Sequence, residues 1–145
     1  MDNTVYENPL ITRYASREMS ENFSDLKRFR LWRKLWIALA ESEMELGLNI
    51  TRAQIEDMKR HADDIDFEVA AKYEHELRHD VMAHVHAFGD QAASAAPIIH
   101  LGATSCFVDC NSELIIMYDA LNIIKEKLVN VMDKLRAFAL KYKDL

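Results

Sequence analysis

Apolar residues recur at helical spacing along most of the chain and predict a succession of helices. A first helix is expected to begin after Ser24 or Asp25 and to stop at Gly47. Four apolar residues fall on its buried face: Phe29, Trp32, Trp36 and Leu39. The 145 residues include only three glycines and two prolines, too few for the turns of a β-sandwich or barrel. The sequence therefore predicts an all-α fold.

Two further helices are predicted from their starting residues. Residues 51–54 (Thr-Arg-Ala-Gln) match a capping box, which indicates the start of a short second helix. Asp66 is a good N-cap for a third helix that runs toward Gly89. That helix is either continuous or interrupted, since Asp80 can cap a new helix. If it is interrupted, His79 and Asp80 lie at a helix N-terminus, where free N–H groups and the helix dipole favour an anion.

The last part of the chain predicts one long helix, capped by Thr104 or Ser105. Nine of its residues, spaced alternately by three and four positions, form an apolar stripe: Leu114, Met117, Leu121, Ile124, Leu128, Val131, Leu135, Phe138 and Tyr142. At 1.5 Å per residue, a helix over residues 106–143 is about 55 Å long. The short helices before it cannot cover the apolar stripe. We therefore expect it to pack against the same helix of other subunits or against sequence that would follow Leu145.

The chain is predicted to have three parts. Residues 1–23 lack strong periodicity and are expected to form an extended arm. Residues 24–103 are expected to form a small N-terminal helical domain, and residues 104–145 the first long helix of an incomplete bundle domain. The small domain would then lead directly into the bundle helix.

The charge balance limits the partners of the chain. A net charge of −6 and a pI near 5.5 argue against a general binder of nucleic acids or anionic membranes. The one basic run is interpreted as a solvated helix face: Lys27, Arg28, Arg30, Arg33 and Lys34. No window approaches the ~18 apolar residues of a membrane span, and the N-terminus lacks the pattern of a signal peptide. A cytoplasmic location is expected, with Cys106 and Cys110 as reduced thiols.

Residues 75–79 (His-Glu-Leu-Arg-His) fit the H-E-x-x-H pattern of zinc proteases. On a helix this pattern places two imidazoles one turn apart on the metal, with Glu76 as the general base. A third ligand is then required, but Met82 and Val85 occupy the positions of the glycine and the third histidine of the extended motif. A zinc metalloprotease is therefore a remote alternative, and we expect no metal.

The densest polar chemistry of the chain surrounds three consecutive residues. Arg78, His79 and Asp80 place a cation, a titratable donor and a carboxylate side by side, a cluster that can hold and orient a polyanionic substrate. The nearby His84 and His86 are interpreted as hydrogen-bonded core or surface residues.

Two hydroxyl groups and an arginine–tyrosine pair are further candidates, and the residues leave two roles open for each. Thr104 and Ser105 follow Gly102 at the start of the last helix, where they cap the helix or also form a cradle for a carboxylate or phosphate. Arg13, beside Tyr14 in the irregular N-terminal segment, is a surface charge or a phosphate ligand.

Three motifs follow one another along the chain. They are residues 9–10 (Pro-Leu) with 13–16 (Arg-Tyr-Ala-Ser), residues 78–86 (Arg-His-Asp-Val-Met-Ala-His-Val-His) and residues 99–105 (Ile-His-Leu-Gly-Ala-Thr-Ser). In order and spacing they resemble the motifs of the adenylosuccinate lyases of animals, within the fumarase and aspartase superfamily. The resemblance extends from Asn8 to Leu145.

This resemblance implies an all-helical homotetramer, in which long helices of all four subunits form a central bundle and each active site takes residues from three chains. The implied reaction eliminates fumarate from adenylosuccinate, to give AMP, and from the succinylated aminoimidazole carboxamide ribotide (SAICAR), to give AICAR, without a cofactor. By motif, Arg13 and Tyr14 would hold the substrate phosphate, Arg78, His79 and Asp80 would orient the substrate, and Thr104 and Ser105 would bind its succinyl part.

The resemblance also implies which groups this sequence does not supply. The general-acid histidine of the family, in a T-H-x-Q-P-like motif, and its catalytic serine, on a flexible loop rich in glycine and serine, do not occur in the sequence. We therefore expect no catalytic residue in this chain, and we expect the 145 residues alone not to release fumarate. A non-catalytic helical association module is the alternative.

Overall fold

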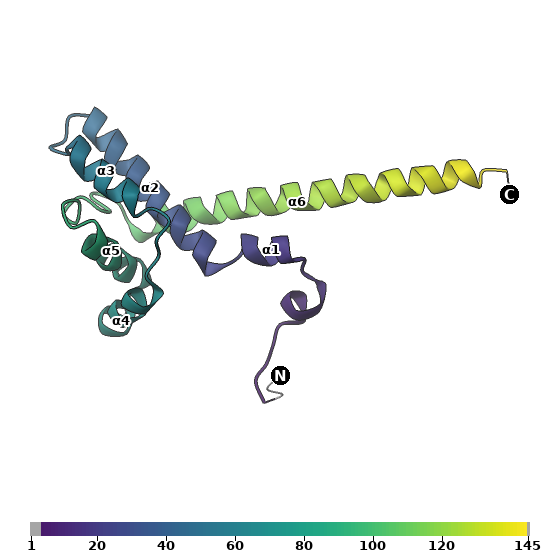
Figure 1. Ribbon diagram of the computed structural model, residues 1–145, viewed down its shortest axis with the longest axis horizontal. Helices are drawn as coiled ribbons and strands as arrows, with labels where there is room; N and C mark the ends of the chain where they lie inside the picture. Colours follow the sequence, from purple (N-terminus) through teal and green to yellow (C-terminus); the bar gives the residue numbers. More distant parts are fainter. Residues whose placement is uncertain (1–3, 145) are drawn as a thin grey trace. The chain divides into compact units, whose positions relative to one another are not determined.

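The computed structural model describes residues 4–144, which contain helices and no strand (Figure 1). The predicted all-α class is confirmed. The elements in chain order are η1 (Leu10–Tyr14), α1 (Arg17–Asn22), α2 (Asp25–Glu45), α3 (Arg52–Arg60), α4 (Phe67–Leu77), α5 (Asp80–Gln91) and α6 (Ser105–Lys141). They belong to two compact units: unit 1 consists of Met1–Phe23 and Ile115–Leu145, and unit 2 of Ser24–Leu114. Within the described range, none of the helices combines the length and apolar character that a membrane crossing requires.

The helix α2 begins and ends as the sequence predicts. The Ser24 hydroxyl accepts a hydrogen bond from the backbone N–H of Lys27 at 3.3 Å, and Gly47 follows the helix with φ +91°, which glycine adopts without strain. Trp32 and Trp36 of α2 are each 1% exposed and belong to the core of unit 2. The core also takes apolar side chains from α3, α5 and the start of α6, among them Ile55, Met58, Val81, Phe88 and Val108.

Arg33 does not belong to the solvated basic face that the sequence predicts, and this corrects the prediction. Its side chain is buried, and its Nη1 donates to the backbone carbonyls of His61 and, at 2.8 Å, Asp64. The guanidinium lies 4.4 Å from the centre of the Phe88 ring. Burial lowers the pKa of Arg33 to about 10, so the group remains charged at neutral pH. The prediction was wrong here because helical spacing does not reveal the loop carbonyls that bind this arginine.

The predicted caps of the next two helices are confirmed. At the start of α3, Thr51 Oγ1 accepts from the N–H of Gln54 at 3.3 Å, and the Gln54 side chain accepts from the N–H of Thr51 at 2.9 Å. At the start of α4, the Asp66 carboxylate accepts from the N–H of Val69 at 3.0 Å. These local bonds fix where both helices begin.

Of the two alternatives for the third predicted helix, the structure contains the interrupted one. The helix α4 ends at Leu77, Arg78 adopts the left-handed conformation (φ 55°, ψ 36°), and α5 begins at Asp80. The N-cap of α5 is His79, one residue before the predicted Asp80, because Nδ1 of His79 accepts from the N–H of Met82 at 3.3 Å. The interruption therefore places His79 and Asp80 at a helix start.

The N-terminal segment contains two short helices, η1 and α1, where an extended arm is predicted, and this corrects the prediction for residues 10–22. The Ser16 hydroxyl caps α1 by accepting from the N–H of Met19 at 3.3 Å. Within unit 1, Nδ2 of Asn22 donates to the carbonyl of Ile116 at 2.9 Å. Such short helices escape a search for periodicity because six residues make fewer than two turns.

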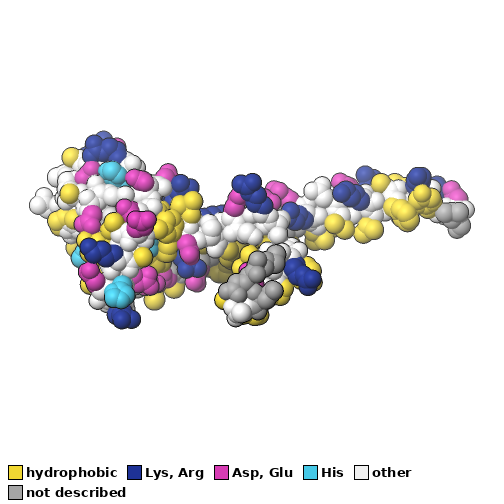
Figure 2. All heavy atoms as spheres, turned by 60° about the horizontal axis from the view of Figure 1, so that its bottom comes forward, with side chains coloured by type: hydrophobic (Ala, Val, Ile, Leu, Met, Phe, Trp, Pro, Cys, Tyr) yellow, Lys and Arg dark blue, Asp and Glu magenta, His cyan; other side chains and the backbone are white. Residues whose placement is uncertain are grey.

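The helix α6 is continuous over 37 residues, which corresponds to about 55 Å at 1.5 Å per residue. It starts at Ser105, so Thr104, one of the two predicted capping residues, directly precedes it, and the carbonyl of Thr104 accepts from the N–H of Phe107 at 2.9 Å. Every residue of the apolar stripe is between 39% and 65% exposed, and Figure 2 shows hydrophobic side chains in yellow along the surface of this helix. The described residues therefore leave the apolar stripe uncovered, as the sequence predicts.

Candidate functional site

Three of the predicted site residues lie at the break between α4 and α5. Because Nδ1 of His79 accepts the capping bond from the backbone, the neutral ring holds its proton on Nε2. Oδ1 of Asp80 accepts from the N–H of Val81 at 2.8 Å and lies 3.6 Å from Nδ1 of His79. Arg78 is exposed, on a left-handed residue that donates its N–H to the carbonyl of Glu74. The break thus presents a guanidinium, an imidazole N–H and a carboxylate to solvent.

The structure brings this cluster together with the hydroxyl pair at the start of α6. Nε2 of His79 lies 3.4 Å from Oγ of Ser105, and Thr104 directly precedes that serine on the surface. The N-termini of α5 and α6 therefore meet at the His79–Ser105 pair. Free N–H groups at helix starts, together with the helix dipoles, favour an anionic ligand. The pair is suited to a carboxylate or a phosphate.

Arg13 and Tyr14 lie in unit 1, whereas the five other predicted site residues belong to unit 2. They form the end of η1, and both side chains are exposed, Tyr14 by 75%. An apolar groove of unit 1 borders Tyr14 and takes its lining from Leu10, Ile11 and Phe23, among others. The exposure of the guanidinium and the phenol leaves both groups accessible to a ligand.

A cavity of about 280 Å³ in unit 2 brings three carboxyl groups together, those of Asp80, Asp109 and Glu113, beside Arg28. Burial raises the pKa of Asp109, and the charges of Asp80 and Glu113 act in the same direction. Asp109 is not among the residues predicted from the sequence, although it follows Ser105 by four positions, the spacing at which side chains share a helix face. Asp109 is therefore a carboxyl group next to the site that binds a proton more readily than usual.

His100 is a second residue of this region to which the sequence analysis gave no role. It has φ +66°, in the left-handed region, and its Nδ1 accepts a hydrogen bond from the indole N–H of Trp36 at 2.9 Å. Burial lowers the pKa of His100, and the neighbouring His79 lowers it further. The signal was present in the sequence, because His100 lies in the third motif, four residues before Thr104.

The H-E-x-x-H pattern does not form the geometry of a zinc site. His75 lies on α4, whereas His79 follows the break at Arg78, so the two imidazoles are not one turn apart on a helix. Among residues 4–144, no group of three or more histidine, cysteine, aspartate or glutamate side chains is arranged to hold a metal ion. The helical arrangement that the protease alternative requires is absent from this part of the chain.

Of the two other histidines of the second motif, His84 is buried and His86 is exposed. The ring of His84 is buried against that of Phe29, with ring centres 3.7 Å apart, and burial lowers the pKa of His84 to about 4. His86 is exposed and stacks on Tyr73. Both cysteines, Cys106 and Cys110, are free thiols on the surface.

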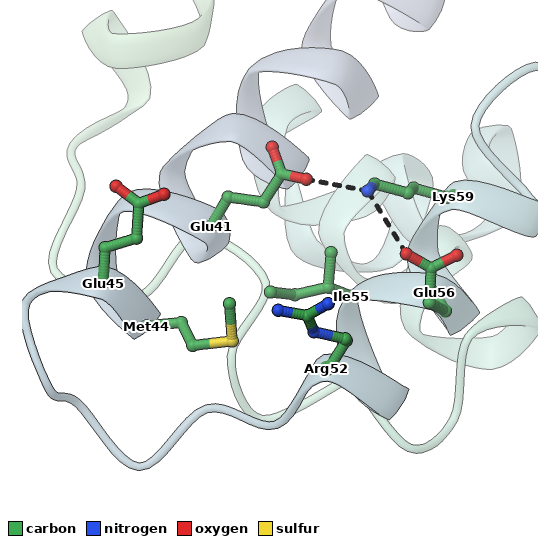
Figure 3. Close-up of a pocket in the computed structure, with 7 residues that line it drawn as sticks. All are labelled: Glu41, Met44, Glu45, Arg52, Ile55, Glu56 and Lys59. Carbon is green, nitrogen blue, oxygen red and sulfur yellow. Dashed lines mark hydrogen bonds and ion pairs between the residues drawn. The ribbon is translucent and has the colours of Figure 1, made fainter.

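Another cavity of unit 2, of about 320 Å³, lies between the end of α2 and α3 (Figure 3). Lys59 extends across it and pairs with Glu41 at 2.8 Å and Glu56 at 3.2 Å. None of the predicted site residues lines this cavity. It is therefore separate from the candidate site.

Comparison with known proteins decides the family. No family model matches the chain. The adenylosuccinate lyases of Saccharomyces cerevisiae, Schistosoma mansoni and Schizosaccharomyces pombe are 54%, 52% and 49% identical to it, and each match covers 97% of the chain. The chain belongs to the adenylosuccinate lyase family. It spans 29–30% of the length of these relatives.

Proposed function

We propose that the chain provides one wall of the active site of an adenylosuccinate lyase, which eliminates fumarate from adenylosuccinate to give AMP and from SAICAR to give AICAR. The His79–Ser105 pair is the observation that supports this proposal within the family. A ring N–H and a hydroxyl at two helix starts can donate to the carboxylate oxygens of a succinyl group.

Elimination of fumarate needs a base that removes a proton from the carbon next to a carboxylate and an acid that protonates the departing nitrogen. The negative charge that develops on this carboxylate is stabilised by donors that are fixed in place before the reaction. In our proposal Thr104, Ser105 and Nε2 of His79 bind the succinyl part. These donors are held by the backbone geometry of two helix starts, so they need no reorganisation when the charge develops.

The other predicted residues have binding roles in this proposal. Arg13 and Tyr14 hold the substrate phosphate, because a guanidinium and a phenol hydroxyl both donate to phosphate oxygens. Arg78 adds a positive charge that attracts the anionic substrate, and Asp80 orients the substrate beside His79. The elimination itself is acid–base chemistry and requires no cofactor.

We further propose that the protein works in the cytoplasm as a homotetramer, in which α6 helices of neighbouring subunits cover the apolar stripe. The spacing of the stripe, alternately three and four residues, is typical of helices that pack side by side in bundles. Its exposure in the single chain supports a partner of this kind.

A chimeric enzyme tests the proposed function. The matching segment of the Saccharomyces cerevisiae lyase, which is 54% identical, is replaced by this chain, and fumarate release from adenylosuccinate is followed. We expect an active chimera. Ser105→Ala and His79→Ala are each expected to lower kcat/KM by about a hundredfold, because each removes a donor that acts on the developing charge.

Lys34→Ala serves as the matched control, since Lys34 is exposed on α2 and lies outside the proposed site. It is expected to change kcat/KM by less than about twofold. A folded, tetrameric chimera that has no activity, or whose Ser105→Ala and His79→Ala variants retain full kcat/KM, would contradict the proposal.

A further inference from the structure

The indole of Trp36 determines the hydrogen-bonding state of His100. Trp36 is 1% exposed, and its Nε1–H, which can only donate, needs an acceptor because it is buried. The acceptor is Nδ1 of His100 at 2.9 Å, and the two rings meet edge to face with centres 5.9 Å apart. A neutral imidazole that accepts at Nδ1 holds its proton on Nε2. The bond therefore selects one tautomer of His100.

The backbone at His100 adds a second observation. A histidine with φ +66° is held in a conformation that side chains other than glycine seldom adopt, and such residues persist only where surrounding contacts hold them. Gly102, two residues on, is also left-handed at φ +64°. The segment that leads into α6 is thus shaped to hold His100 against Trp36.

His100 also lies in the segment that leads to the His79–Ser105 pair, five residues before Ser105. Burial is the main cause of the lowered pKa of His100, and His79 lowers it further. The same segment continues into Thr104 and Ser105, which the proposed function assigns to substrate binding. His100 therefore belongs to the same segment as the residues proposed to bind the succinyl part.

We propose that Trp36 is a positioning residue of the site: its indole N–H holds His100 in the Nε2–H tautomer and so fixes the donor that this segment offers to an oxygen of the substrate. The role of Trp36 at a substrate site rests on the proposed function. The tautomer itself does not, so the two parts can be tested separately.

Nuclear magnetic resonance of the 15N-labelled chain tests the tautomer. We expect a scalar coupling across the hydrogen bond between Nε1 of Trp36 and Nδ1 of His100, with ring nitrogen shifts of a single Nε2–H tautomer. In Trp36→Phe the Nδ1 shift is expected to move toward its protonated value as the second tautomer becomes populated. The coupling in the wild type shows which tautomer His100 adopts even if Trp36→Phe does not fold. Its absence, or an Nδ1–H tautomer in the wild type, would overturn the proposal.

Trp32 offers a matched control. It is also 1% exposed, lies one turn before Trp36 on α2, and donates its indole N–H to Oγ of Ser112 at 3.1 Å. Trp32→Phe removes the same indole from the same core but does not touch the bond to His100. The His100 shifts are therefore expected to stay at their wild-type values in Trp32→Phe, and an equal movement in both variants would overturn the proposal.

Activity of the chimeric lyase tests the positioning role. Trp36→Phe is expected to lower kcat/KM by about tenfold more than Trp32→Phe, and to cause no further loss when His100→Gln is already present, because Trp36 acts through His100. An inactive wild-type chimera would count against the proposed function and leave the tautomer result standing. An active chimera in which the two tryptophan variants lose the same kcat/KM would overturn the positioning role alone.

Discussion

At the scale of single residues, His84 shows how burial changes the chemistry of a side chain. Its ring is 5% exposed, lies against Phe29 and meets the edge of Trp32 at 5.5 Å between ring centres. Burial lowers the pKa of His84 from 6.5 to about 4, and the positive charge of Arg33 acts in the same direction. Between these two pH values the unfolded chain takes up a proton that the folded chain does not. Folding is therefore favoured above pH 6.5 and loses this contribution as the pH falls toward 4.

We expect the free energy of unfolding to decrease between pH 6.5 and 4, with a slope from this group of up to about 1.4 kcal/mol per pH unit. Urea denaturation at several pH values measures it. His84→Gln should remove this part of the slope, whereas His86→Gln, at an exposed position on the same helix, should retain it. The prediction is wrong if the wild type and His84→Gln show the same dependence on pH.

At the scale of elements, the break between α4 and α5 creates the candidate site. In a continuous helix His79 would lie in the helix interior and could not act as an N-cap. No helix start would then face Ser105. The break depends on Arg78, whose left-handed backbone costs about 1 kcal/mol relative to glycine. An arginine at a position that favours glycine is consistent with a binding role for its side chain.

Arg78→Gly is therefore expected to affect stability and function in opposite directions. The free energy of unfolding should rise by about 0.5 kcal/mol, because relief of the strain exceeds the entropic cost of glycine in the unfolded chain. In the chimeric lyase, kcat/KM should fall. Gly47→Ala is the converse control: no atom within 4 Å would meet the added Cβ, so its φ of +91° alone should destabilise the chain. Urea denaturation measures both, and a destabilised Arg78→Gly would contradict the expectation.

The elements also show which features a sequence reveals. Ser24, Asp66 and the Thr51–Gln54 box were predictable because a cap acts on a backbone group three positions away, and both partners can be seen in one short segment. The break at Arg78 was left open because an arginine gives no signal for a left-handed backbone. The contacts of Arg33 and His100 were missed because their partners are distant in the chain, 64 positions for the bond between Trp36 and His100. Local chemistry was readable, and chemistry that depends on tertiary packing was not.

At the scale of the whole molecule, the apolar stripe of α6 is the feature that single-chain packing does not explain. Unit 2 has a buried core of its own, whereas residues such as Leu121 and Leu135 of α6 remain more than 60% exposed. Exposed apolar rows of this length mark surfaces that associate with other chains. The proposed tetramer covers the stripe with copies of itself.

Changing Leu121, Leu128 and Leu135 to lysine should therefore abolish self-association, because three charges would have to be buried in the bundle. Sedimentation velocity should show an assembled wild type and a monomeric variant with unchanged helical circular dichroism. Glu126→Lys with Asp133→Lys, at positions outside the apolar stripe, adds a similar positive charge and should leave assembly intact. A wild-type chain that stays monomeric at high micromolar concentration would contradict the prediction.

The exposed apolar stripe also makes the completion of folding depend on protein concentration in the proposed tetramer. Unit 2 can bury its core within one molecule, at a rate that does not depend on how many copies are present. In the proposed tetramer, covering α6 requires an encounter between molecules, and the waiting period shortens as the concentration rises. During that period a newly made chain exposes apolar surface to chaperones, to proteases and to wrong partners. For the proposed tetramer, the rate of synthesis, as well as the sequence, therefore decides what fraction of the chains assembles.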